Sequence, residues 1–262
     1  QVLATSEPEG AARRAGRSRA LIAFGPMLAL PLGGLLTLWA GPRPIFLILA
    51  VCCLVGVWIS RGLPTAGHDL HSTPGRRFKW PDTVALWSFI EGVALDGLFI
   101  FGLSIQAQKI MGGDAVLIAG GLMGLRYLSE LLLSPLGGRA AQRFGATSML
   151  LWFSFLSALA LAAFGSHWVI VGAAAVLVLR ALQLPLVTTL VAERNPGTLR
   201  VSALASNAVW RDIGAGLGPL LAGLLLPVAS APWVFGLAGA AIAVSAVFCW
   251  RARLPTDVSL GR

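Results

Sequence analysis

The stretch WVIVGAAAVLVLRALQLPLVTTLVA (residues 168–192) decides the fold class, because Arg180 is its only charged side chain. A helix needs about 20 apolar residues to cross about 30 Å of hydrocarbon, so this stretch is long enough to span a membrane. Seven more apolar segments occupy residues 21–39, 45–60, 83–105, 115–136, 147–164, 201–226 and 233–250. A chain that is 56% hydrophobic and 12% charged is too apolar for a soluble domain. We therefore predict an all-α polytopic membrane protein with eight transmembrane helices.

The positive charge lies mainly on one side of these predicted spans. Of the 20 Lys and Arg residues, 15 fall in the connections of one side. Arg43 and Lys109 fall on the other side, and Arg126, Arg180 and Arg211 lie inside spans. The positive-inside rule places the basic side in the cytoplasm, where it also meets anionic headgroups. The sequence thus predicts an integral protein of the plasma (bacterial inner) membrane with both termini cytoplasmic. The net charge of +9 could suggest a nucleic-acid binder, but the basic residues flank the spans in short loops and form no single patch, so we predict no nucleic-acid partner.

Two short motifs resemble those of one transporter family. After the fourth span, Gly138, Arg143 and Gly145 match the spacing of the cytoplasmic loop signature of the major facilitator superfamily. This chain has Gln142 where the family signature has an acid. The sixth span is similar to the family in its Arg-x-x-Gln pattern, which begins at Arg180.

A third motif, in the first span, extends the resemblance. Its Gly-Pro and Gly-Gly pairs, at residues 25–26 and 33–34, are similar to the helix motif associated with antiporters of the family. The resemblance implies the last eight of twelve helices, with the first four apparently lacking. Residues 1–61 would be the last two helices of the N-terminal half-bundle, and residues 62–80 the cytoplasmic central linker. Residues 81–254 would form the six-helix C-terminal bundle, followed by a cytoplasmic tail at residues 255–262.

What the resemblance implies for function is secondary active transport of a small solute by alternating access. Proton coupling with efflux by antiport is the favoured variant, and it rests on the first-span motif. Partners would be the lipid bilayer, the solute and protons. The alternatives are a non-transporting membrane scaffold or sensor, and a lipid-modifying membrane enzyme, which should show clustered His, Asp or Cys at the interface.

Charged residues inside the spans are candidates for the chemistry, because a charge at the bilayer centre costs at least about 2.5–3.5 kcal/mol and needs a partner, water or a function. Glu91 and Asp96 have no basic neighbour on their own span. At 100° per residue they point about 140° apart, so we expect them in different environments. Either acid is a candidate for proton coupling, because a carboxyl group removed from water can exchange a proton near neutral pH. A hydrogen-bonded structural role is the alternative.

The remaining charges and amides have different interpretations. Arg126 and Glu130 are one helical turn apart, which predicts a structural charge pair. Arg211 and its neighbour Asp212 are interpreted as a second, locking pair. Candidates for the substrate path are Arg180, Gln183 and Gln106.

No cofactor, metal site or enzymatic activity is predicted. The sequence shows no glycine-rich phosphate loop, no nucleophile beside a base and no zinc-spaced cluster. His68 and His71 could bind a metal, but we interpret their polar segment as a solvated loop.

Overall fold

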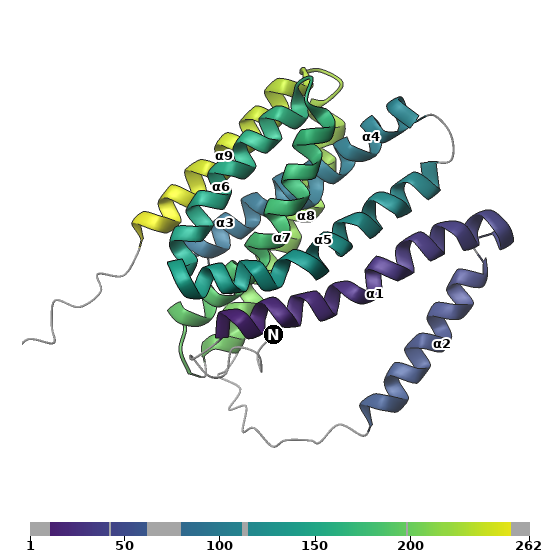
Figure 1. The fold of residues 1–262 in the computed structure, drawn as a ribbon, viewed down its shortest axis with the longest axis horizontal. Coiled ribbons are helices and arrows are strands. Elements are labelled where there is room, and N and C mark those ends of the chain that lie inside the picture. Colours follow the sequence, from purple (N-terminus) through teal and green to yellow (C-terminus); the bar gives the residue numbers. More distant parts are fainter. Residues whose placement is uncertain (1–10, 42, 62–79, 112–114, 198, 253–262) are drawn as a thin grey trace, which may run out of the picture.

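The computed structural model describes residues 11–41, 43–61, 80–111, 115–197 and 199–252, and every regular element there is a helix (Figure 1). The elements are α1 (Ala11–Ala40), α2 (Arg43–Ser60), α3 (Thr83–Glu91), the π-helix η2 (Gly92–Leu98), α4 (Phe99–Met111), α5 (Ala115–Phe144), α6 (Ala146–Gly165), α7 (Val169–Arg194), α8 (Leu199–Leu225) and α9 (Ala231–Arg251). Because α3, η2 and α4 run end to end as one rod, the described residues contain eight helical rods. The predicted all-α architecture is confirmed. His68 and His71 lie outside the described residues.

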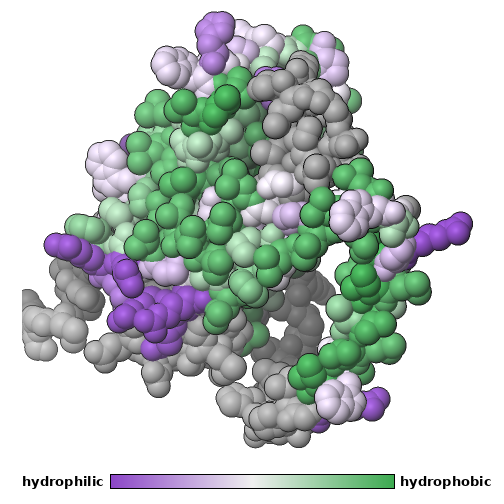
Figure 2. All heavy atoms as spheres, turned by 45° about the vertical axis from the view of Figure 1, so that its right-hand side comes forward, coloured by the Kyte–Doolittle hydropathy of each residue, from purple (hydrophilic) through white to green (hydrophobic). Residues whose placement is uncertain are grey.

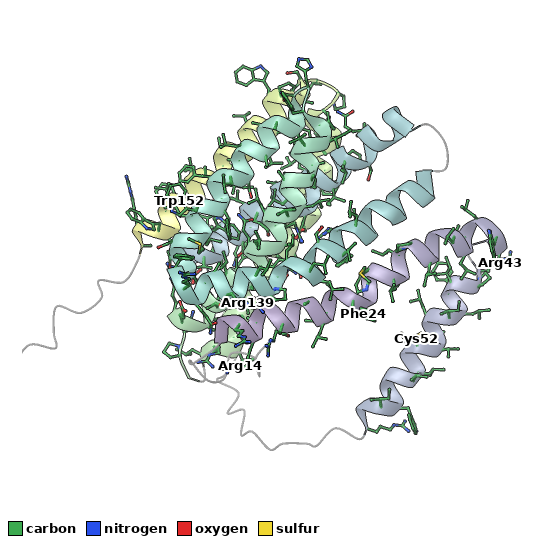
Figure 3. The ribbon with its side chains drawn as sticks, in the orientation of Figure 1. Arg14, Phe24, Arg43, Cys52, Arg139 and Trp152 are labelled. Carbon is green, nitrogen blue, oxygen red and sulfur yellow. The ribbon has the colours of Figure 1, made fainter. Side chains whose placement is uncertain are left out.

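Hydropathy supports a membrane-embedded bundle. Among the described residues, five helical stretches are long and apolar enough to cross a membrane: Arg13–Ala40, Thr83–Gln106, Ala146–Gly165, Val169–Arg194 and Ala231–Arg251. A shorter apolar helix covers Arg43–Ile59. Apolar side chains cover much of the side of the bundle (Figure 2). Trp152 on α6 belongs to this outer face and is 63% exposed (Figure 3), as expected for a side chain that meets lipid.

Helix packing positions the site in the part of the bundle that follows residue 80. There, α6 packs against both α7 and α9, α5 packs against α7, and the α3–η2 rod packs along α8. Phe164 sits between Phe99 and Phe235, with ring centroids 4.9 and 4.8 Å away, and these edge-on aromatic contacts join α4, α6 and α9. Before residue 80, α1 lies along α5, and α2 packs chiefly against α1 (Figure 1).

Small residues bring η2 and α8 into backbone contact. A Cβ on Gly97 would overlap the Cα of Gly218, and a Cβ on Gly92 would overlap the carbonyl oxygen of Arg211. Membrane helices use such glycines because lipid supplies no hydrophobic force between helices and close packing must replace it. The contact places Arg211 of α8 directly beside the carboxyl-bearing segment of the α3–η2 rod.

One end of the bundle, which we call the basic end, is where α1, α3, α6 and α8 begin and α5, α7 and α9 end. Arg194, at the end of α7, donates hydrogen bonds of 3.0 Å to Thr83 Oγ1 and to the carbonyl oxygen of Cys249, which joins α3, α7 and α9 there. Arg14 on α1 and Arg139 on α5 lie at this same end (Figure 3). The basic end is the side that the charge pattern predicts to be cytoplasmic.

The predicted loop after the fourth span is shorter than expected. Helix α5 continues through Gly138 and Arg143 to Phe144, and α6 begins at Ala146. Gly145 makes the corner with φ of +83°, a left-handed conformation that glycine adopts without the steric cost of a side chain. Its N–H still donates to the carbonyl oxygen of Ala141 at 2.9 Å, so the helix end is closed and no flexible loop is needed.

Candidate functional site

Arg180 of α7 lies at the centre of a buried charge cluster. Its guanidinium donates to the carboxyl groups of Asp96 on η2, with a 2.7 Å bond from Nε, and of Glu130 on α5. A third carboxyl oxygen, that of Glu91 on α3, lies 3.8 Å from Arg180 Nε. Each of these four side chains is less than 10% exposed. Arg180 therefore links three carboxyl groups from two other rods of the bundle.

Arg126 of α5 is the second cation of the cluster. Its Nη2 donates to Asp96 at 2.7 Å, and its Nε lies 3.6 Å from Glu130. The predicted pair of Arg126 and Glu130 thus lies within a larger network, because both residues also contact groups on other helices. Asp96 and Glu130 are each held by two guanidinium groups, whereas Glu91 is in ion-pair range of Arg180 alone among the described residues.

The cluster has an uneven charge count. Its three carboxyl groups have two guanidinium groups in ion-pair range, so these five groups carry one excess negative charge when all are ionised. Arg211, which borders the same cavity, is paired with Asp212. A net charge is unfavourable in a low-dielectric site, and binding one proton would neutralise it. Glu91 makes the longest and weakest ion-pair contact of the three carboxyl groups, so protonating it would disturb the cluster least.

The expectation that Glu91 and Asp96 occupy different environments is wrong. The helix is not a regular α-helix here: η2 runs from Gly92 to Leu98, and the N–H of Phe99 bonds to the carbonyl oxygen of Ala94, five residues earlier. The i→i+5 repeat of a π-helix brings residues five positions apart onto nearly the same face. Both carboxyl groups therefore lie beside Arg180.

A cavity adjoins the cluster between α3, α7 and α8. Its volume is about 40 Å³, and its lining includes Glu91 of the cluster together with Trp87, Ser88, Gln183, Leu184, Val187, Thr188, Leu204, Asn207, Ala208 and Arg211. Ser88 Oγ donates a 2.9 Å hydrogen bond to Asn207 Oδ1, which ties α3 to α8 across the cavity. The amide nitrogen of Gln183 donates to Ser157 Oγ at 3.3 Å, while its buried Oε1 accepts no hydrogen bond from any described residue.

Sequence reasoning missed three polar residues of this cavity, Ser88, Thr188 and Asn207. Helical spacing contains a signal for two of them. Ser88 precedes Glu91 by three positions and Asn207 precedes Arg211 by four, so each shares a helix face with a charged candidate. The sequence points to Thr188 less clearly, because a threonine in a membrane helix can satisfy its hydroxyl on its own backbone. Its hydroxyl does so here, by donating to the carbonyl oxygen of Leu184.

Comparison with known families settles the broad class. The family model described as the Major Facilitator Superfamily matches residues 92–261, which is more than half of the 262-residue chain. The chain belongs to the major facilitator superfamily. A search of curated proteins finds no relative that matches the chain. The superfamily is made up of transporters, so this is an integral membrane protein of a transporter family and the predicted family resemblance is confirmed.

The match of the major facilitator superfamily begins within the candidate site. It starts at the first residue of η2 and covers Asp96, Arg126, Glu130 and Arg180, whereas Glu91 directly precedes it. The charge cluster is therefore built almost entirely from the segment that defines family membership.

The remaining predicted residues of this superfamily member lie at the margin of the cluster or apart from it. Gln183 lines the cavity one turn from Arg180. Gln106 lies on α4, roughly 15 Å along the rod from Asp96, and takes no part in the cluster. Arg211 donates to its neighbour Asp212 at 2.7 Å and also lines the cavity; their side chains are 26% and 65% exposed.

Proposed function

We propose that this protein is a secondary active transporter that moves a small solute by alternating access and couples that movement to protons. The observation that carries the proposal is the buried cluster of three carboxyl groups and two guanidinium groups on three rods of the bundle. If the cluster only held the helices together, equal numbers of carboxyl and guanidinium groups would be enough. An unbalanced cluster can bind and release a proton as the helices around it move.

Within the cluster, Glu91 is the proposed proton carrier and Asp96 its partner. Asp96 is engaged by Arg180 and Arg126 at 2.7 Å, so protonating it would leave two buried cations with fewer partners. Glu91 is 3.8 Å from Arg180 and borders the cavity, so its charge can change with less disturbance. Arg180 would then act as the hub that senses the charge of Glu91.

Alternating access fits the placement of the cluster. Its members come from α3, η2, α5 and α7, and interactions across these elements can be exchanged when the elements rock against one another. Efflux by antiport is supported by the first-span motif, whose proline, Pro26, lies inside the long helix α1. We propose the plasma (bacterial inner) membrane as the location, with the basic end toward the cytoplasm.

The test is solute-driven proton movement in inside-out membrane vesicles. A fluorescent dye reports the pH gradient while a panel of small organic cations, anions and neutral solutes is added. We expect a transported solute to dissipate the gradient with the native chain and not with Glu91→Gln. Glu193→Gln is the matched control, because Glu193 is exposed near the end of α7, away from the cluster. Unchanged solute-driven flux in both Glu91→Gln and Asp96→Asn would exclude proton coupling through these acids.

A further inference from the structure

The cavity between α3, α7 and α8 is too small for most solutes but suits water. Its volume of about 40 Å³ exceeds the roughly 10–15 Å³ that a cavity needs to hold one water molecule, so it has room for a few. Polar groups from all three helices border it, which is what a buried water needs to complete its hydrogen bonds. Among them are Ser88, Gln183, Thr188 and Asn207.

The buried amide oxygen of Gln183 independently indicates a ligand in this cavity. The residue is 1% exposed, and its Oε1 accepts no hydrogen bond from the part of the protein that the structure describes. Its amide nitrogen is used by Ser157, so the amide group is held in place while its oxygen needs a donor. Buried amide oxygens are rarely left without a donor, and a water molecule supplies one.

The cavity extends from the cluster toward the basic end. Glu91 and Gln183 lie roughly 12 and 16 Å from the basic-end termini of their helices, counted at 1.5 Å per residue. Thr188 and Leu204, also in the lining, lie only about 8–9 Å from those termini. The cavity therefore begins beside the cluster and continues part of the way toward the side from which we expect cytoplasmic water.

We propose that this cavity holds a short chain of water molecules that carries protons between the basic end and Glu91. The inference rests on the proposed function, in which Glu91 exchanges the proton. The water at the inner end of the chain gives a proton to a Glu91 carboxylate oxygen, where an O–H bond forms, and receives a proton from the next water in the chain. One proton enters the chain at the basic end, so no cation needs to reside in the cavity. Release runs in reverse.

The charges around Glu91 favour water over a bound metal cation. Arg180 on α7 and Arg211 on α8 face it, with Asp96 on its own rod and the Arg126–Glu130 pair of α5 behind Arg180. A sodium ion resident in the cavity would sit against the guanidinium of Arg211 and be repelled. Water is uncharged and is not repelled by Arg211. A proton that reaches Glu91 neutralises its carboxylate, so no added charge remains in the cavity.

The experiment first measures hydration without relying on transport. Gln183→Cys is introduced into a full chain that carries Cys52→Ser, Cys53→Ser and Cys249→Ser, and its modification by Ag⁺ is followed in membrane vesicles of each orientation. We expect modification from the face of the basic end. Ala208→Leu narrows the cavity and should abolish the modification. Ala205→Leu is the matched control, because Ala205 is also exposed on α8 but does not line the cavity.

Proton flux in the otherwise native chain then separates the inference from the function on which it rests. Ala208→Leu should lose solute-driven proton flux while Ala205→Leu retains it. Failure of Ag⁺ to reach Gln183→Cys would overturn the water chain even where Glu91→Gln abolishes coupling. If Ag⁺ modifies Gln183→Cys but Ala208→Leu keeps full proton flux, the water chain is also overturned. Solute movement that requires Na⁺ in place of a pH gradient would instead overturn proton coupling, which is the proposed function. A different result, unchanged solute-driven proton flux in Glu91→Gln, would contradict the proposed function itself.

Discussion

Glu91 and Asp96 are five residues apart in one helical rod, and both lie within ion-pair range of Arg180. A regular α-helix would point them about 140° apart. The π-helix η2, which begins directly after Glu91 and contains Asp96, removes most of that difference. The two acids are therefore unequal members of one site: Asp96 is tightly held by two arginines, and Glu91 is loosely held beside a cavity.

This inequality predicts different costs for removing each charge. Asp96→Asn leaves Arg126 and Arg180 short of a buried partner, and breaking a buried ion pair in this way costs about 3–5 kcal/mol of stability. Glu91→Gln should cost clearly less, because the one ion-pair contact of Glu91 among the described residues is at 3.8 Å. Thermal unfolding of both variants in detergent measures the order. An equal or larger loss for Glu91→Gln would contradict the view that Asp96 is the structural member.

Length and hydropathy were enough to predict the helices, because a chain that crosses lipid must satisfy its backbone within each segment. The apolar segment at residues 168–192 became α7 (Val169–Arg194), and that at residues 147–164 became α6 (Ala146–Gly165). Arg180 also stood out, because a lone charge in such a segment needs a partner. These features depend on local sequence and on the solvent, and they require no knowledge of neighbouring helices.

The partners of Arg180 could not be predicted, because they depend on a local departure from α-helical geometry. Nothing in the residues from Gly92 to Leu98 requires a π-helix. We infer that tertiary contacts stabilise it: the backbone of Gly92 against α8, and the ion pairs of Asp96 with Arg126 and Arg180. The cavity could not be predicted for a second reason: its polar lining comes from three helices that are distant in sequence.

Close packing between η2 and α8 predicts sensitivity to a single methyl group. Gly218→Ala would place its Cβ against the Cα of Gly97, so the two backbones must separate. Overpacking of this kind typically costs about 1–3 kcal/mol. Gly216→Ala is the matched control on the same helix, because nothing lies within 4 Å of the added Cβ. Thermal unfolding should show a loss for Gly218→Ala alone; similar behaviour of the two variants would mean that the backbones are not in contact.

The corner between α5 and α6 predicts a requirement for glycine. Gly145 has φ of +83°, and a Cβ there meets open space, so the cost of Gly145→Ala comes only from the backbone conformation. That cost is about 1–3 kcal/mol for a non-glycine residue held in a sparsely populated backbone region. Gly25→Ala, at an open helical position of α1, provides the comparison in the same unfolding measurement. Equal stability of Gly145→Ala and the native chain would show that the corner does not need the left-handed conformation.

The orientation of the bundle predicts which side chains a reagent can reach from each face of the membrane. Arg143 lies exposed near the end of α5 at the basic end, and Arg43 begins α2, which follows the opposite end of α1. In a chain with its three cysteines replaced, Arg143→Cys should react with a membrane-impermeant maleimide in inside-out vesicles and be protected in intact cells. Arg43→Cys should show the reverse pattern. Labelling of Arg143→Cys from outside intact cells would show that the topology is the reverse of the one proposed. The cavity beside Glu91 would then open toward the cell exterior, and protons would reach Glu91 from that side.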